Sequence, residues 1–344
     1  MQLTSFDFFL LFCASFLLTS LLTPAVRVFA LKFGVTDSPT QAHKTHKEPV
    51  PYLGGVAIIV GTIATTFGSA LLTDFTLQTL LLASTILLPA ILMSIVGLID
   101  DIKQLKPWPR FVAQNALALV SATILVKTDT LGAPFGVLAL DFAVTMLWLV
   151  GITNSVNFFD NIDGGASGAI AISSVALTLI AVWNGQILIG AMSAVLAGSA
   201  IGFLIWNKPP ARIYMGDAGA LFLGILIATL TIRLDSNEEL GTVGVFIPFL
   251  LLAIPILDTT VAVTKRIYRR LSPFQGGRDH LSHRLMRLGL KKRNAVLTLW
   301  LLSVVFSILA VMLSKNHSRD AVVTFGGVLW GLLLVCFLYT EDEN

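Results

Sequence analysis

The chain has 344 residues, of which 55% are hydrophobic and 12% charged, and its mean hydropathy is +0.84. Soluble globular domains carry about twice this share of charged residues, so the composition excludes an ordinary soluble protein. The formal net charge of +3 says little in sum. No Walker A loop, dinucleotide fingerprint or zinc-finger spacing is present, and no nucleic-acid partner is expected.

Long apolar blocks predict an all-α, polytopic integral membrane protein. Most blocks reach or approach the roughly 20 residues that a helix needs to cross a bilayer. We predict about 11 spans, at residues 8–26, 53–72, 79–99, 111–126, 142–156, 165–183, 186–206, 218–232, 242–264, 295–314 and 321–339. No internal repeat or long linker marks a second domain, so residues 1–344 are expected to form one transmembrane domain.

Lysine and arginine are unevenly divided between the loops that join these spans. With the N-terminus outside, 19 of the 23 Lys and Arg residues fall in inner loops and four in outer loops. Positive residues are retained on the cytoplasmic side of membrane proteins. We therefore expect a multi-pass protein of the plasma or inner membrane, with its N-terminus outside and its C-terminus in the cytoplasm. The first span lacks a basic leader and a cleavage site, and is expected to be a retained anchor.

Two adjacent carboxylates, Asp100 and Asp101, end the third predicted span. Adjacent negative charges at a membrane surface favour a bound cation or a raised pKa. The residues leave two roles open: holding Mg²⁺, or accepting a proton from an acidic substrate. The structural alternative is a helix that ends in solvated charge, which the helix dipole disfavours because its C-terminal end is negative.

The densest polar cluster follows the fifth predicted span. Residues 154–164 contain five amide or carboxylate side chains: Asn154, Asn157, Asp160, Asn161 and Asp163. If the helix continues, the three asparagines share one face and Asp160 lies beside Asn157. So many polar groups at membrane depth are costly unless they face a wet cavity or a ligand. A polar seam between helices would explain one asparagine but not the whole cluster.

Asp217 stands at the start of the eighth predicted span, directly after Tyr214-Met215-Gly216. Its structural interpretation is an N-terminal cap, because aspartate favours the positive end of a helix. Catalysis is the alternative. We favour catalysis because Asp217 falls on the same side of the membrane as the other carboxylates.

The inner loop 265–294 carries ten Lys and Arg residues as well as His280 and His283. Positive-inside charge or anionic lipid headgroups explain most of that charge. They do not explain the segment 276–284, where two glycines permit close backbone approach and Arg278 and Arg284 could clamp a diphosphate together with the two histidines. The inner loop 37–55 is expected to form a second basic wall through His43, Lys44, His46 and Lys47.

A carboxylate centre, a basic rim and a hydrophobic surround are all expected on one membrane face. Phosphoryl transfer between a soluble nucleoside diphosphate and a lipid needs all three, since cations neutralise the charge of the transferred group while the fold positions nucleophile and leaving group. The expected active site is formed by the cytoplasmic loops 27–52, 100–110, 157–164, 207–217 and 265–294.

The chain resembles the polyprenyl-phosphate N-acetylhexosamine-1-phosphate transferases, of the glycosyltransferase family 4 type. The resemblance covers about residues 8–290 and rests on five ordered motifs: His43-Lys-Thr-His46…Pro51-x-Leu-Gly54-Gly55, Gly97-Leu-Ile-Asp100-Asp101, Asn154-x-x-Asn157-Phe-x-Asp160-x-x-Asp163-Gly164, Tyr214-Met215-Gly216-Asp217-x-Gly219 and Asp279-His280-Leu-Ser-His283-Arg284-Leu285. Four positions depart from the common pattern: Asn161, Gly165 and Ala218, often Gly, Leu and Ser, and Ser282, often His.

The last motif and Asn157-Phe are similar to the branch that uses UDP-N-acetylglucosamine or a related donor. For that branch, the resemblance implies that undecaprenyl phosphate attacks the β-phosphorus of the donor. The products are UMP and polyprenyl-diphosphate-GlcNAc, in the first membrane step of a cell-envelope glycan such as lipopolysaccharide or teichoic acid. Mg²⁺ is the expected cofactor, with Mn²⁺ as a substitute, and a homodimer stays open.

The resemblance also assigns roles to residues. Asp217 would be the principal Mg²⁺ ligand, with Asn157 and Asp100, and the catalytic carboxylates would be Asp100, Asp101, Asp160 and Asp217. Asp163 and Asn207 would recognise uracil, on which Tyr214 would stack. The diphosphate and sugar would be held by Lys47, Arg278, His280 and His283, and Asp258 is a weaker candidate behind them.

Two other functions compete with this interpretation. The peptidoglycan branch, which uses UDP-N-acetylmuramoyl-pentapeptide, is the alternative within the family; its last loop carries a run of three histidines that this chain lacks. An ion-coupled transporter also combines intramembrane carboxylates with broken helices. A transporter should show paired halves and polar groups near mid-span, whereas here they lie at the inner ends of the spans.

Overall fold

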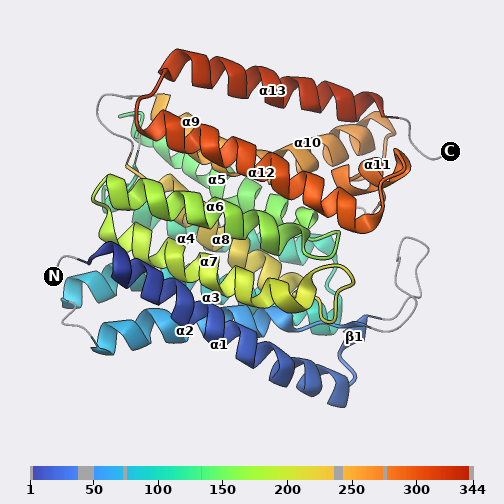
Figure 1. Ribbon diagram of the computed structural model, residues 1–344, viewed down its shortest axis with the longest axis horizontal. Coiled ribbons are helices and arrows are strands. Elements are labelled where there is room, and N and C mark those ends of the chain that lie inside the picture. The colour runs from blue at the N-terminus through green and yellow to red at the C-terminus, as the bar shows by residue number, and fades with distance from the viewer. Residues whose placement is uncertain are drawn as a thin grey trace.

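The computed structural model describes residues 3–37, 50–72, 76–132, 134–235, 243–273 and 277–340 as an almost entirely helical protein (Figure 1). The helices are α1 (Ser5–Lys32), α2 (Gly54–Leu72), α3 (Leu77–Lys103), α4 (Pro107–Lys127), α5 (Leu138–Phe159), α6 (Gly165–Trp183), α7 (Ile187–Asn207), α8 (Gly216–Ile232), α9 (Phe246–Leu251), α10 (Ala253–Tyr268), α11 (Leu281–Arg287), α12 (Lys292–Ser314) and α13 (Arg319–Tyr339). The short strands β1 (Thr36–Asp37) and β2 (Val50–Pro51) pair antiparallel.

Nine helices in the described part of the chain are long and apolar enough to cross a membrane: α1 to α7, α12 and α13. The blocks at 111–126 and 142–156, short in the sequence, belong to helices of 21 and 22 residues. Helix α8 has only 17 residues. The apolar block predicted as one span over 242–264 forms two helices, α9 and α10, which pass the length and hydropathy test only together and meet at a bend of 77°. The count of 11 spans stays a prediction.

Burial separates central from peripheral helices. In α6 and α7, 72% and 78% of the apolar window is buried within the protein, against 17% in α1 and in α13. Every side chain of α8 from Ala218 to Thr231 is buried, and α8 packs against α3 and α5. Figure 1 shows α13 and α1 on opposite edges of the bundle. The two edge helices therefore present most of their apolar surface to lipid.

Glycines let neighbouring helices approach the first turn of α8. A Cβ at Gly97 in α3 would overlap the backbone of Asp217 and Ala218, and a Cβ at Gly55 in α2 would overlap the backbone of Gly219. The start of α2 also binds the turn before α8 through backbone hydrogen bonds. The start of α8 is thus wedged between α2 and α3.

The elements that carry the sequence motifs meet at one end of the bundle. Figure 1 places β1 and α11 at the end opposite the beginning of α1. The last turns of α3 and α5 and the first turns of α4 and α8 meet at this same end, through the contacts of Arg110 with Asp100 and Asp217 and of Asn157 with Asp217 described below. We call it the motif end of the bundle.

Candidate active site

Carboxylates from two helices share one guanidinium at the motif end. Arg110, near the start of α4, donates through Nη1 to Asp100 Oδ2 at 2.6 Å and to Asp217 Oδ2 at 2.8 Å. Asn157, near the end of α5, donates through Nδ2 to Asp217 Oδ1 at 2.6 Å. The Asp217 side chain is 29% exposed, against 6% for Asp100. Asp217 is therefore the carboxylate that a ligand reaches more easily.

Asp101 holds the N-terminus of α8. Its Oδ1 accepts the backbone N–H of Asp217 at 2.8 Å, and its Oδ2 accepts that of Ala218 at 3.0 Å. The first N–H groups of a helix lack partners within the helix, and a carboxylate is stabilised at that positive end. Gly216 allows this approach, since it has a φ of +71° and a Cβ there would meet Asp101 Oδ2 at 2.6 Å. The capping interaction that the sequence suggested for Asp217 is made by Asp101 instead.

Asp160 follows α5 directly and adds a further negative charge. Burial is the main cause that raises the pKa of its carboxyl well above the usual value, followed by the charges of Asp217, Asp163 and Asp101. The Asp160 residue is partly exposed to solvent. Asp160 thus lies near three other carboxylates of this end of the bundle, whose charges add to the effect of burial.

The side chains at this centre fit a hard cation by chemistry. Carboxylate and amide oxygens are the donors that Mg²⁺ prefers, and Asp217, Asn157 and Asp100 supply them. In the described ranges, no group of three or more His, Cys, Asp or Glu is arranged to hold a metal, and Arg110 lies between two of the carboxylates. Because the two carboxylates of Asp100 and Asp217 share the single positive charge of Arg110, negative charge remains for a divalent cation to neutralise.

Asp163 and Asn207 are occupied by contacts within the protein. Asp163 is 6% exposed, pairs with Lys292 Nζ at 2.7 Å through Oδ1 and accepts the N–H of Ala211 at 3.0 Å through Oδ2. Asn207 is 1% exposed. Its amide makes contacts of 3.0 Å with Gly164 N, Ser167 Oγ and Ile213 O. Both residues join the loop after α5 to the loop before α8.

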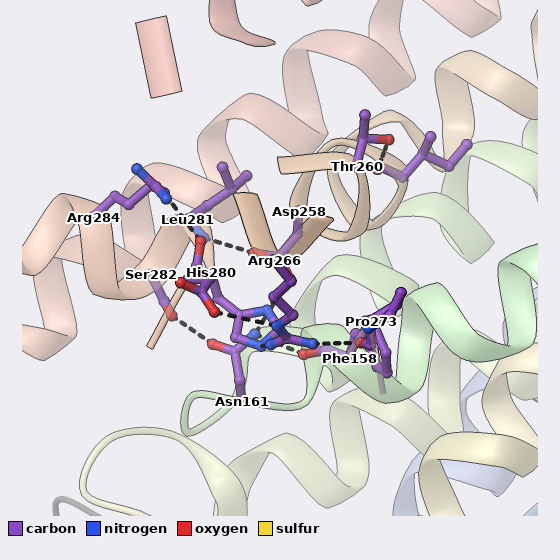
Figure 2. A network of polar contacts seen from close by, with 12 residues as sticks. Phe158, Asn161, Asp258, Thr260, Arg266, Pro273, His280, Leu281, Ser282 and Arg284 are labelled. Atoms are coloured by element: carbon purple, nitrogen blue, oxygen red, sulfur yellow. Dashed lines mark hydrogen bonds and ion pairs between the residues drawn. The ribbon is translucent and has the colours of Figure 1, made fainter. Parts of the chain in front are cut away.

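Residues of the inner loop 265–294, here called the basic loop, contact the buried carboxylate of Asp258. His280 Nδ1 lies 2.7 Å from Asp258 Oδ2, and His280 Nε2 lies 3.2 Å from Arg266 Nη2 (Figure 2). Arg266 also donates through Nε to Asp279 Oδ2 at 3.2 Å. His280 is 6% exposed, and both of its ring nitrogens are engaged. The structure thus places His280 inside a network of contacts in the loop.

The other predicted binding residues lie around these two networks. His283 is partly buried, its Nδ1 has no hydrogen-bond partner among the described residues, and its ring centroid lies 6.0 Å from that of His280. Burial is the main cause that lowers the pKa of His283 to about 4. Arg278 is exposed and Tyr214 partly exposed. Lys47 lies outside the residues that the structure describes.

Two arginines at the centre of these networks were not predicted as site residues. In the sequence, Arg110 and Arg266 stand out only as two of the positive charges of the inner loops. Arg110 contacts residues 10 and 107 positions away in the chain. A signal existed for Arg110, because adjacent carboxylates at a helix end require a cation nearby.

The chain is similar in sequence to known membrane-lipid transferases, as follows from one family model and several relatives. Residues 82–235 match the family model described as "Glycosyl transferase family 4". Over 88% of its length, the chain is 34% identical to 84% of a Bacillus subtilis protein named "Probable undecaprenyl-phosphate N-acetylglucosaminyl 1-phosphate transferase". The chain belongs to glycosyl transferase family 4, among its polyprenyl-phosphate N-acetylhexosamine-1-phosphate transferases.

Two further relatives represent other members of this family. Over 95% of its length, the chain is 30% identical to 89% of a Mycobacterium leprae protein named "Decaprenyl-phosphate N-acetylglucosaminephosphotransferase". Over 87% of its length, it is 29% identical to 95% of a Halalkalibacterium halodurans protein named "Phospho-N-acetylmuramoyl-pentapeptide-transferase". The family is thus confirmed as the sequence motifs indicated, and the more similar relatives bear GlcNAc-phosphate names.

Two of the four departures from the common family pattern contact each other. Ser282, in the first turn of α11, donates its hydroxyl to Asn161 Oδ1 at 2.5 Å, as Figure 2 shows. Asn161 in turn donates to Asp258 Oδ2 at 3.4 Å. These two substitutions therefore form one pair that joins the acidic segment after α5 to the basic loop.

Proposed function

We propose that this protein transfers N-acetylglucosamine-1-phosphate from UDP-N-acetylglucosamine to undecaprenyl phosphate, releasing UMP. One observation carries the proposal most directly: the Bacillus subtilis relative, 34% identical over most of both chains, is named as a probable transferase of N-acetylglucosaminyl 1-phosphate for undecaprenyl phosphate. The motif end supports it, because the last turn of α5 joins an acidic centre to the basic loop: Asn157 contacts the accessible carboxylate of Asp217, and the next residue, Phe158, packs against Arg266.

The proposed reaction is a substitution at the β-phosphorus of the donor. An oxygen of the lipid phosphate forms the new bond to that phosphorus, and the bond from the β-phosphorus to the oxygen bridging it to the α-phosphorus breaks. The leaving oxygen departs on UMP. A lipid phosphate is largely ionised at neutral pH, so little general-base assistance is required, and positioning and charge neutralisation dominate.

Mg²⁺ bound at the acidic centre would neutralise charge on the diphosphate. We assign Asp217 and Asn157 as its principal holders, with Asp100 beside them. Arg110 would keep Asp100 and Asp217 together before the donor arrives, since it bonds both carboxylates. Asp101 would fix the start of α8 and thereby the position of Asp217.

The remaining residues would shape the nucleotide and sugar site. We assign Arg278 and His283 to the diphosphate and sugar, Lys47 to the same group, and Tyr214 to stacking on the base. Asp163 and Asn207 would hold the walls of the uracil site, because their polar atoms already bind neighbouring loops. His280 would act from within the network of the basic loop.

We also propose that the motif end faces the cytoplasm and that residues 1–344 form one domain of the plasma or inner membrane. The donor is a soluble cytoplasmic nucleotide, and 19 of the 23 Lys and Arg residues lie in loops assigned to that side. The acceptor would reach the same end from the inner leaflet.

A panel of labelled donors tests the proposal. Purified protein, undecaprenyl phosphate and Mg²⁺ are incubated in turn with UDP-GlcNAc, UDP-GalNAc and UDP-MurNAc-pentapeptide, and label in the lipid extract is counted. We expect UDP-GlcNAc to give the highest turnover. Faster transfer from the muropeptide donor would place the chain in the peptidoglycan branch. Absence of lipid product with every donor would refute the proposed activity.

A further inference from the structure

Asp258 is a fully buried carboxylate to which the proposed chemistry gives no role. It lies in α10, just beyond the 77° bend from α9, and is 0% exposed. Its Oδ1 accepts the backbone N–H of Leu281, the first residue of α11, at 2.7 Å. Its Oδ2 lies 2.7 Å from His280 Nδ1. Burying a carboxylate is costly unless specific partners satisfy it, and these contacts do so.

The contacts of His280 determine where its proton sits. Arginine carries only donors, so the contact of Arg266 Nη2 with His280 Nε2 requires Nε2 to accept. A neutral imidazole with an accepting Nε2 carries its hydrogen on Nδ1, which then donates to Asp258. His280 is thereby a neutral Nδ1–H tautomer, fixed by an acid on one side and a guanidinium on the other.

The same carboxylate also ties three segments together. Asn161, in the loop after α5, donates to Asp258 Oδ2 at 3.4 Å and accepts from Ser282. Arg266 lies over the ring of Phe158, 5.5 Å from its centroid. Phe158 directly follows Asn157, the residue that contacts Asp217. Figure 2 shows Asp258 beside both Leu281 and His280, between α10 and α11.

We propose that Asp258 is a positioning residue, which sets the tautomer and orientation of His280 and docks the basic loop against the acidic segment after α5. It touches no substrate. The proposal concerns the site of the transfer proposed above, and so it rests on that function for its kinetic consequence. Its structural part, the tautomer of His280, stands independently of which reaction the protein performs.

The substitution Asp258→Asn makes a specific prediction about the proton. The backbone N–H of Leu281 is an obligatory donor and keeps the single amide oxygen of the new side chain. The amide nitrogen then faces His280 Nδ1, which has to accept. The ring proton moves to Nε2, where it opposes the N–H of Arg266. We expect His280 to lose the Nδ1–H tautomer and its fixed orientation.

Imidazole nitrogen NMR reads this out directly. The chain has five histidines, so selective ¹⁵N-histidine labelling in detergent gives a simple spectrum, in which His280→Asn assigns the His280 signals. At pH 7 we expect the Nδ1–H pattern for the unsubstituted protein and its loss in Asp258→Asn. An Nε2–H or imidazolium pattern in the unsubstituted protein, or an Nδ1–H pattern that persists in Asp258→Asn, would overturn the proposal.

A second variant keeps the test decisive if Asp258→Asn does not fold. Arg266→Met removes the guanidinium and leaves Asp258 in place. If Asp258 sets the tautomer, the Nδ1–H pattern persists in Arg266→Met. A switch to Nε2–H would show that the arginine sets it, which contradicts the proposal.

Activity gives the kinetic consequence, with a matched control. Asp141 is also a buried aspartate, 8% exposed, that accepts a backbone N–H, from Phe135 at 2.6 Å, but it lies at the other end of α5. We expect Asp258→Asn to lower kcat about tenfold or more and Asp141→Asn to stay within about twofold. Equal losses in both variants would show a general effect of removing a buried carboxylate and would overturn the positioning role. If the unsubstituted protein transfers no phospho-sugar, the proposed function fails, while the NMR result still decides the tautomer.

Discussion

Arg110 explains how two carboxylates from distant parts of the chain stay close together in the acidic centre. Asp100 and Asp217 would repel each other, and the guanidinium bonds both. The two carboxylates differ in access, since Asp217 is 29% exposed and Asp100 only 6%. At the scale of single residues, the centre therefore combines a buried anchor with one carboxylate that a bound cation or diphosphate can reach.

The accessible carboxylate is the residue whose charge should matter most. Asp217→Asn keeps the size of the side chain and removes one negative charge, so a divalent cation at the centre would lose a charged ligand. We expect transfer to fall about a hundredfold or more, with the thermal unfolding temperature little changed. Asp129→Asn, at an exposed position before α5, is the control. Activity of Asp217→Asn within a few-fold of the unsubstituted protein would show that Asp217 holds no catalytic cation.

His283 offers a pH test at the same scale. Its pKa is lowered to about 4 by burial in the folded protein, from an ordinary value of 6.5. Since the unfolded chain binds the proton more tightly, the contribution of His283 to stability is complete above about pH 6.5 and is lost as the pH falls toward 4. Between pH 7.5 and pH 5 the loss is on the order of 2 kcal/mol.

Thermal unfolding of the unsubstituted protein and of His283→Gln, measured across this pH range, isolates that contribution. We expect the difference between the two unfolding temperatures to shift in favour of His283→Gln as the pH falls. A difference that is independent of pH would mean that His283 takes up its proton equally well in the folded and unfolded states.

At the scale of elements, the position of α8 controls the acidic centre. Helix α8 is short and buried, its first turn is held by Asp101, and it lies against glycines of α2 and α3. This packing determines the position of the Asp217 carboxylate. A change in helix spacing should therefore alter the site even where no polar atom is removed.

Gly97→Ala tests that dependence. A Cβ at Gly97 would overlap the backbone of Asp217 and Ala218, which cannot move as freely as a side chain. We expect a loss of about 1 to 3 kcal/mol in stability and at least a tenfold loss of transfer. Gly151→Ala, within α5, is the matched control, because no atom of the described residues lies within 4 Å of the added Cβ. If the two variants behave alike, the contact between α3 and α8 does not position the site.

The sequence predicted most of these helices, because each apolar block is long and bounded by polar or turn residues. It did not predict the break between α9 and α10, where a single apolar block hides a bend of 77°. It predicted one site for Asp100, Asn157 and Asp217, because all three fall on the same side of the membrane. It could not show that Asp101 caps α8 or that Asn207 binds neighbouring loops, since those contacts depend on how the helices pack.

At the scale of the whole molecule, the polar motifs collect at one end of an apolar bundle. A protein of this kind can bind a soluble donor and a membrane lipid at one place, provided that this end faces the compartment that holds the donor. The orientation proposed here follows from the unequal distribution of Lys and Arg between the loops.

Cysteine labelling tests that orientation. With Cys13 and Cys336 replaced, single cysteines are placed at two exposed positions, Lys208 at the motif end and Thr128 at the other. We expect an impermeant thiol reagent to label Thr128→Cys in intact cells and Lys208→Cys only after the cells are opened. The reverse pattern would invert the proposed topology.

The proposed reaction passes a phospho-sugar, and not a sugar alone, to the lipid. The most direct test supplies UDP-GlcNAc labelled with ³²P at the β-phosphorus and with ³H in the uridine, together with undecaprenyl phosphate and Mg²⁺. If the bond between the α- and β-phosphates breaks as proposed, ³²P appears in the lipid fraction and ³H in UMP, in equal amounts. Release of both labels together as UDP would show transfer of the sugar alone and would contradict the proposed reaction.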